Sequence, residues 1–197
     1  DFVQLHGVRP TALEAYRDGY APRTVRAHFG SWFSFLGALS LLEPAEEAVL
    51  GTCPEFLRAL EVTRMTRSFK MATLLGMLNA DRFPGAIELT ELSRAVMELC
   101  ERQSAVRADF GDHCHDEGSL AACLRENPIA AWTGAADGGP YFDFDGTRFT
   151  SKVIVSEEHK PALQLLTREL AEWRLAEYLE GQQEVAPDSY IVKVTHS

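Results

Sequence analysis

The stretch TRMTRSFKMATLLGML (residues 63–78) decides the fold, because a short basic segment leads directly into an apolar helix. Its first eight residues hold three cations, Arg64, Arg67 and Lys70, among three hydroxyl side chains. The residues that follow are almost all apolar, so the helix is expected to be buried on nearly every face. Ser68 is expected to be its N-cap, with the hydroxyl accepting a hydrogen bond from the first turn.

The start of this helix predicts an anion site. A helix N-terminus presents free N–H groups and the positive end of the helix dipole, both of which favour an anion such as phosphate. Arg64, Arg67 and Lys70 add positive charge around that end. The alternative interpretation, which the sequence leaves open, is a core helix with an ordinary solvated lead-in.

Proline positions and strand patterns predict the rest of the fold. Pro10, Pro22, Pro44 and Pro54 stand where first helical turns could begin, so the first third is expected to be a set of short helices. Aromatic and β-branched residues on both sides of an Asp-Gly pair predict an antiparallel hairpin near 140–155. We therefore expect a mainly α, multi-helix globular domain with a small antiparallel β-hairpin before a long C-terminal helix.

The long helix is expected at 157–180, with Ser156 as its cap. Its charged residues should form a solvated, ion-paired face. These residues are Lys160, Arg168 and Arg174, with Glu157, Glu169, Glu172 and Glu177. A last strand is predicted at 190–194.

The chain divides naturally at the basic segment. Residues 1–67 are expected to form an N-terminal helical part and residues 68–197 a helical core with the hairpin and the C-terminal helix, although one continuous domain also fits. A short extended piece around Ile87 lies between two helices of the second part. This arrangement fits winged or helix-turn-helix modules, and it equally fits two packed core helices.

The net charge of −10 argues against a general nucleic-acid binder. Residues 1–70, however, contain equal numbers of basic and acidic residues, so all of the excess negative charge lies in residues 71–197. A basic surface on the first part is therefore compatible with the composition. Arg23 and Arg26 form a second basic-aromatic patch with His28, Phe29, Trp32 and Phe33, which suits single-stranded bases unless these aromatic residues belong to the core.

Histidine, cysteine and carboxylate side chains cluster between residues 109 and 123. His113, His115 and Cys123 are weak candidates for metal ligands, and an acidic solvated loop is the alternative. Cys53 and Cys100 are expected to be buried free thiols, and disulfides are not expected. The sequence has no nucleotide-binding or nucleophile motif, so we expect no cofactor, no resident metal and no enzymatic activity from this chain alone.

No apolar run approaches the about 20 residues that a membrane span needs, and no export signal opens the sequence. A cytoplasmic location without a membrane partner is therefore expected. The first residue, Asp1, fits a fragment cut from a longer protein.

Six segments together carry a resemblance to a known family, and they span about Leu5 to Leu179. The segments are LHGVRPTALEAYRDG, FLRALEVTRMTRSFKMATLLGML, AVRADFGD, ENPIAAWTG, YFDFDGTRF and LTRELAEWRLAEYL. In this order they resemble the C-terminal accessory region of bacterial DEAD/DEAH-box helicases of superfamily 2. None of these segments is a catalytic signature.

This resemblance implies a DNA-binding accessory domain of a helicase-like repair or defence protein. The motor domains, in the same or a partner chain, would supply ATP hydrolysis. The expected DNA contacts are Arg64, Arg67, Ser68, Lys70, Arg23 and Arg26. Two alternatives remain: a protein–protein docking module of the same helicase and, less favoured, a metal-dependent hydrolase.

A second resemblance is to the sulfur-recognising DNA-binding domains of some type IV restriction enzymes. It rests on the helix at 68–78 and on the later hairpin. Those domains place a His-Lys/Arg-Pro segment at the head of the helix, where this chain has Phe69, Lys70 and Met71.

Overall fold

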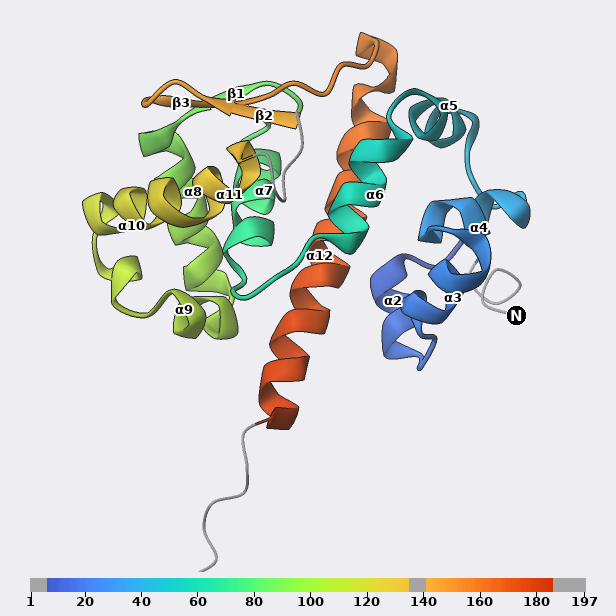
Figure 1. Cartoon of the computed structure of the whole chain (residues 1–197), viewed down its shortest axis with the longest axis horizontal. Coiled ribbons are helices and arrows are strands. Elements are labelled where there is room, and N and C mark those ends of the chain that lie inside the picture. The colour runs from blue at the N-terminus through green and yellow to red at the C-terminus, as the bar shows by residue number, and fades with distance from the viewer. Residues whose placement is uncertain (1–6, 135–140, 186–197) are drawn as a thin grey trace, which may run out of the picture.

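The computed structural model describes residues 7–134 and 141–185, and these are mainly helical (Figure 1). The first part comprises α2 (Ala12–Arg17), α3 (Pro22–Phe29), α4 (Trp32–Ala38), α5 (Pro44–Thr52) and α6 (Pro54–Val62). The second part comprises α7 (Phe69–Asn79), β1 (Ala86–Glu88), α8 (Leu89–Arg102), α9 (Ser104–Phe110), η1 (Gly111–His115), α10 (Glu117–Leu124), η2 (Arg125–Ile129), α11 (Ala130–Thr133), β2 (Phe142–Phe144), β3 (Arg148–Ser151), η4 (Glu157–His159) and α12 (Lys160–Val185).

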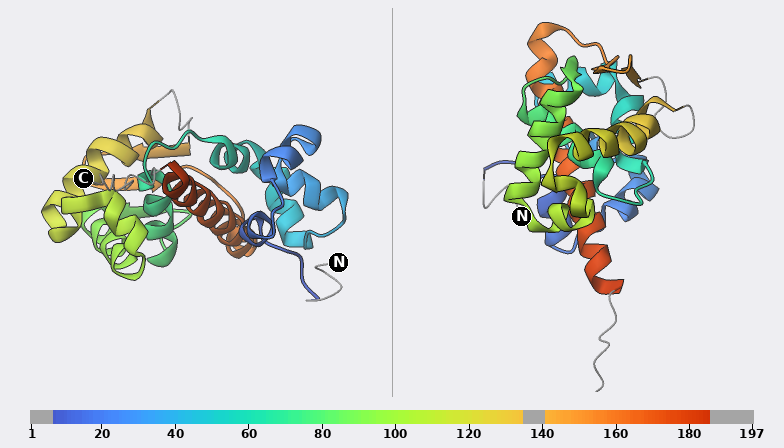
Figure 2. Two further views of the ribbon diagram at one scale, coloured as in Figure 1. Left: turned by 90° about the horizontal axis from the view of Figure 1, so that it is seen from below. Right: turned by 90° about the vertical axis from the view of Figure 1, so that its left-hand side faces the viewer.

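The 26-residue helix α12 lies between the first part and the other elements of the second part (Figures 1 and 2). It packs against α2, α5 and α6 of the first part and against α7 of the second. Both parts therefore complete their cores on the same helix. Within residues 7–134 and 141–185, every helix is too short or too polar to cross a membrane.

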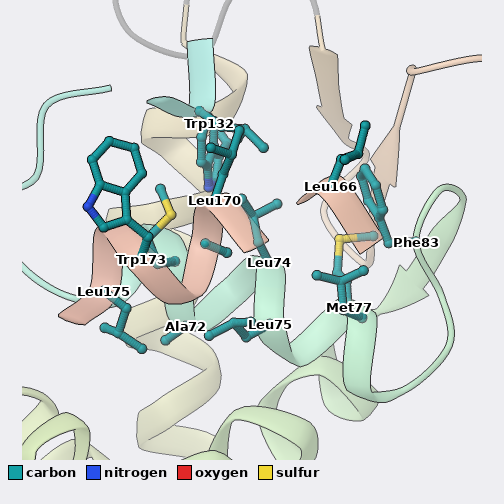
Figure 3. Packing of buried hydrophobic residues seen from close by; sticks show 14 of the residues in the cluster. Ala72, Leu74, Leu75, Met77, Phe83, Trp132, Leu166, Leu170, Trp173 and Leu175 are labelled. Atoms are coloured by element: carbon teal, nitrogen blue, oxygen red, sulfur yellow. The ribbon is translucent and has the colours of Figure 1, made fainter. Parts of the chain in front are cut away.

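Helix α7 is buried on all sides from Lys70 to Leu78, which confirms the burial expected of this helix. Its Leu74 and Met77 lie among side chains from α12, including Leu166 and Leu170 (Figure 3). A Cβ atom at Gly76 would lie 2.9 Å from a methyl carbon of Val96, so only glycine permits this close approach of α7 to α8.

A three-stranded antiparallel sheet, in the order β1-β3-β2, covers one end of the second part. The predicted hairpin is confirmed, and β1 extends it through the pairing of Ile87 with Phe149. The turn is held by the carboxylate of Asp145, which accepts hydrogen bonds from the N–H groups of Thr147 and Arg148 at 2.9 and 2.8 Å. Phe149 stacks on Phe142 at 4.9 Å, so the inner face of the sheet belongs to the core.

The mainly helical fold with a hairpin before a long C-terminal helix is confirmed, with two local differences. Pro22, Pro44 and Pro54 begin helices as predicted, whereas Pro10 precedes the Thr11 cap of α2. Ser156 does not cap the long helix, because a 3-10 turn intervenes and α12 begins at Lys160. The strand predicted at 190–194 lies outside the described residues.

A buried carboxylate joins α12 to the first part. Glu169 accepts hydrogen bonds from Trp32 Nε1 at 2.7 Å, from the Ala12 N–H at 2.9 Å and from Arg9 Nη2 at 2.9 Å. Arg9 also pairs with Glu46 at 2.7 Å. Burial raises the pKa of the Glu169 carboxyl, while the hydrogen bonds from Arg9 and Trp32 act in the opposite direction. The expected solvated face is therefore wrong at Glu169, whose side chain is 3% exposed.

Replacing Glu169 by alanine is expected to lower the free energy of unfolding by about 3–5 kcal/mol, because the Arg9 charge and the Trp32 N–H would lose their buried partner. Glu172→Ala is the matched control. Glu172 is on the same helix and forms a surface ion pair with Arg168 at 3.7 Å, so a loss below about 1 kcal/mol is expected. Urea denaturation followed by circular dichroism measures both, and equal losses would contradict the role of the buried carboxylate.

Candidate nucleic-acid interface

The segment 63–68 joins α6 to α7 and is held by its backbone carbonyls. Arg174 Nη2 donates to the carbonyl of Thr63 at 2.8 Å, and the hydroxyl of Tyr178 donates to that of Thr66 at 3.0 Å. Lys70 Nζ donates to the carbonyl of Arg64 at 3.2 Å. These contacts fix the path of the segment while the side chains of Arg64 and Arg67 remain exposed.

The anion expected at the start of α7 is an internal one, the carboxylate of Asp109 on α9. The N–H of Ser68 donates to Asp109 Oδ2 at 2.6 Å, and Arg67 Nη1 donates to Oδ1 at 3.1 Å. The hydrogen bond to Asp109 raises the pKa of the Arg67 guanidinium, which is 61% exposed. The helix end is therefore already neutralised from within.

Ser68 and Lys70 lie inside the protein. Ser68 occupies the predicted N-cap position of α7, but it has helical backbone angles and is fully buried, and its hydroxyl has no hydrogen-bond partner among the described residues, so the expected side-chain cap is wrong. Lys70 is 8% exposed, with Nζ 3.1 Å from the hydroxyl of Thr63 and 5.4 Å from the centre of the Trp132 ring. Neither side chain is placed to meet an external phosphate.

Two grooves flank the segment. The first, of about 600 Å³, lies between Arg64, Arg67 and the turn around Pro128. The second, of about 410 Å³, lies between Arg64, α3 and α12. The cations that line the two grooves are Arg23, Arg26, Arg64, Arg67, Lys70 and Arg174, and the acidic residues are Glu61, Glu126 and Glu177. We call the side chains of Arg23, Arg26, Arg64 and Arg67 the linker surface. The lining of its grooves is net positive in an acidic chain.

The four arginines of the linker surface differ in how far nearby acidic residues neutralise their positive charge. Arg23 is 71% exposed and pairs with Glu177 at 3.1 Å, whereas Arg26 is 24% exposed and lies 3.7 Å from Glu61. Arg64 forms no ion pair with any residue that the structure describes. Arg64 is therefore the least compensated charge of this surface.

Two largely buried charged residues, Glu61 and Arg174, lie beneath the linker surface. Glu61 accepts hydrogen bonds from the N–H of Trp32 at 3.1 and 3.2 Å, and burial raises the pKa of its carboxyl. Burial lowers the pKa of Arg174, which pairs with Glu177 and holds the carbonyl of Thr63.

The predicted basic-aromatic patch is only partly at the surface. Trp32 and Phe33, its larger apolar members, are buried in the core. Phe29 is 45% exposed and packs edge-on against Phe35 at 5.1 Å, and Tyr20 stacks on the same ring at 5.8 Å. Core packing therefore accounts for most of the aromatic residues in this region.

The helix after the extended piece at Ile87 does not form a basic surface. In the winged or helix-turn-helix arrangement expected around that piece, α8 would meet the nucleic acid. The exposed charged residues of α8 are Arg94, Glu98, Glu101 and Arg102, whose charges cancel. Charge thus favours the linker surface over this helix.

The weak metal-ligand candidates have separate partners. His113 Nδ1 lies 3.2 Å from the hydroxyl of Ser119, and His115 Nε2 lies 3.6 Å from Asp112. Cys123 is buried in α10. Among residues 7–134 and 141–185, no three His, Cys, Asp or Glu side chains are arranged to hold a metal ion.

No family model, curated protein or solved structure matches this chain.

Sequence reasoning missed Asp109, Tyr178 and the inward role of Arg174. These residues are 41 or more positions away from the segment that they contact. No local pattern points to such partners, although an acidic residue was to be expected near a helix start rich in cations.

Replacing Asp109 by alanine is expected to lower the free energy of unfolding by about 1–3 kcal/mol, because the N–H of Ser68 loses its acceptor at the start of a buried helix. Asp112→Ala is the control in the neighbouring turn, where the carboxylate is fully exposed. Chemical denaturation of both variants checks this, and equal stability of Asp109→Ala and the parent would contradict the capping role.

Proposed function

We propose that this chain binds nucleic acid through the linker surface, as the accessory domain of a helicase-like DNA repair or defence protein. The observation that carries the proposal is the exposure of Arg64 and Arg67 on a backbone held in place by Arg174 and Tyr178. Because this backbone is already ordered, binding would cost only the side-chain freedom of the two arginines, and the planar fork of a guanidinium suits phosphate oxygens. Contacts of this kind position a backbone without reading its sequence.

The proposed contact is weak for the isolated domain. Arg23, Arg64 and Arg67 are the most exposed cations of the surface, and the rest of the chain carries the excess negative charge. We expect micromolar or weaker affinity, with motor domains in the same or a partner chain supplying the remaining contacts and the ATP chemistry. The chain itself acts without enzymatic activity in this proposal.

A docking module of the same helicase is the second candidate. It is favoured by the burial of Ser68 and Lys70 and by the internal carboxylate of Asp109, which leave fewer groups for phosphate than the sequence predicts. Ile154, 82% exposed just before α12, is an apolar side chain that such a partner could cover.

Binding to labelled duplex DNA is expected to weaken steeply with salt. Neutralisation of two or three phosphates gives a slope of about −2 to −3 in a plot of log affinity against log salt concentration. Fluorescence anisotropy at several salt concentrations measures this slope. A slope near zero would favour the docking module.

The variant Arg64→Glu with Arg67→Gln is expected to abolish binding. Arg67 is neutralised and not reversed, because a glutamate there would repel Asp109 and disturb α7. The control is Arg94→Glu with Arg102→Gln on α8, where the side chains are 65% and 71% exposed and the change in net charge is the same. Loss of binding in both double variants, or in neither, would overturn the proposal.

Asp109→Asn is expected to act in the opposite direction. It removes the negative charge beside Arg67 and keeps an acceptor for the N–H of Ser68. Since an exposed ion pair is worth about 0.2–1 kcal/mol, its removal should tighten DNA binding by up to about five-fold at low salt. Unchanged or weaker binding, measured by the same anisotropy titration, would count against phosphate contact by Arg67.

A further inference from the structure

Two thiols of the second part lie in direct contact. Cys114 in η1 donates a hydrogen bond to the sulfur of Cys100 in α8, and the two sulfur atoms are 2.9 Å apart. Bonded sulfurs in a disulfide are about 2.05 Å apart, so a small side-chain movement would join them. Neither thiol has a part in the linker surface.

The two thiols differ in their access to solvent. Cys100 is 1% exposed, whereas Cys114 is half-buried at the surface of its turn. Burial raises the pKa of the Cys100 thiol and keeps it from solvent, so the half-buried Cys114 is the sulfur that a peroxide in solution can reach. A solvent-accessible sulfur beside a buried one is the arrangement of a peroxide-attacking and a resolving cysteine.

A third thiol lies on α10, the helix that packs against both α8 and η1. Cys123 in α10 is buried, with its sulfur 3.9 Å from Asn127 Nδ2, and burial raises the pKa of its thiol. Cys53 belongs to the junction of α5 and α6 in the first part.

We propose that Cys100 and Cys114 form a modification site, at which a hydroperoxide converts the two thiols into a reversible disulfide. The sulfur of Cys114 attacks the peroxide, breaks its O–O bond and becomes a sulfenic acid, and one water (for hydrogen peroxide) leaves. The sulfur of Cys100 then attacks the Cys114 sulfur, and its proton leaves with the sulfenic oxygen as a second water. The two thiols lose two electrons and two protons, and the peroxide is reduced.

The disulfide would close the segment 100–114, which includes α9 and therefore Asp109. Oxidation would tie the carboxylate that neutralises the start of α7 more firmly to α8. The proposal does not depend on nucleic-acid binding, because it rests only on the contact between the two sulfurs.

The full chain treated with a small excess of hydrogen peroxide is expected to lose the mass of two hydrogen atoms, and dithiothreitol should restore it. Trypsin cuts at Arg94, Arg102, Arg107 and Arg125, so the expected bond links peptide 95–102 to peptide 108–125. A glutamate-specific protease then cuts after Glu117 and separates Cys114 from Cys123. Mass spectrometry after both digestions identifies the bonded pair.

The decisive variant is Cys53→Ala with Cys123→Ala, which keeps the proposed pair and is expected to lose the same two hydrogens. Cys114→Ala is expected to form no intramolecular disulfide, with circular dichroism of the reduced protein checking its fold. A bond between Cys114 and Cys123, failure of the double variant to lose two hydrogens, or accumulation of sulfinic acid on Cys114 in the parent would each overturn the proposal.

Discussion

The position of α12 depends on one buried carboxylate. Glu169 receives hydrogen bonds from Arg9, Ala12 and Trp32, all in the first part of the chain, while the neighbouring residues Leu166 and Leu170 pack against α7 of the second part. A buried charge is tolerated only when its donors are correctly placed, so this carboxylate specifies how the first part meets the helix. The remaining helices pack around this contact. The segment 63–68 passes from the first part to the second beside α12, where Arg174 and Tyr178 hold it.

Elements governed by local rules were predictable from the sequence. The apolar run after Lys70 predicts a buried helix, the Asp145-Gly146 pair predicts the hairpin, and prolines at first-turn positions predict three helix starts. Groups whose partners are distant in sequence were not predictable in this way. Glu169 looks like one more acid on a charged helix face, and only its contacts with residues 137 or more positions away make it a core residue. Ser68 has the residue type of an N-cap, yet the carboxylate that accepts a hydrogen bond at the start of α7 belongs to Asp109, on a different helix.

The candidate site shows the same limit. The sequence correctly indicates positive charge near the start of α7, and it correctly indicates that an anion is favoured there. It does not distinguish an external phosphate from an internal carboxylate, because both satisfy the same helix dipole. With Asp109 in place and paired with Arg67, the uncompensated positive charge lies outward on Arg64, away from the helix end itself. The set of residues predicted from charge alone to bind an anion therefore changes once the internal partner, Asp109, is known.

The place of α12 at the end of the described sequence has a consequence for how the protein is made. The N–H of Ala12 is hydrogen-bonded to Glu169, 157 residues later, so the first helices leave the ribosome long before their partner exists. Until then the apolar faces around Trp32 and Leu60 have no covering helix, and a nascent chain with such faces is prone to association. Contacts this distant in sequence also slow folding, because a long loop must close before they form. The N-terminal helices are therefore the segment that depends most, during synthesis, on rapid completion of the chain or on chaperones.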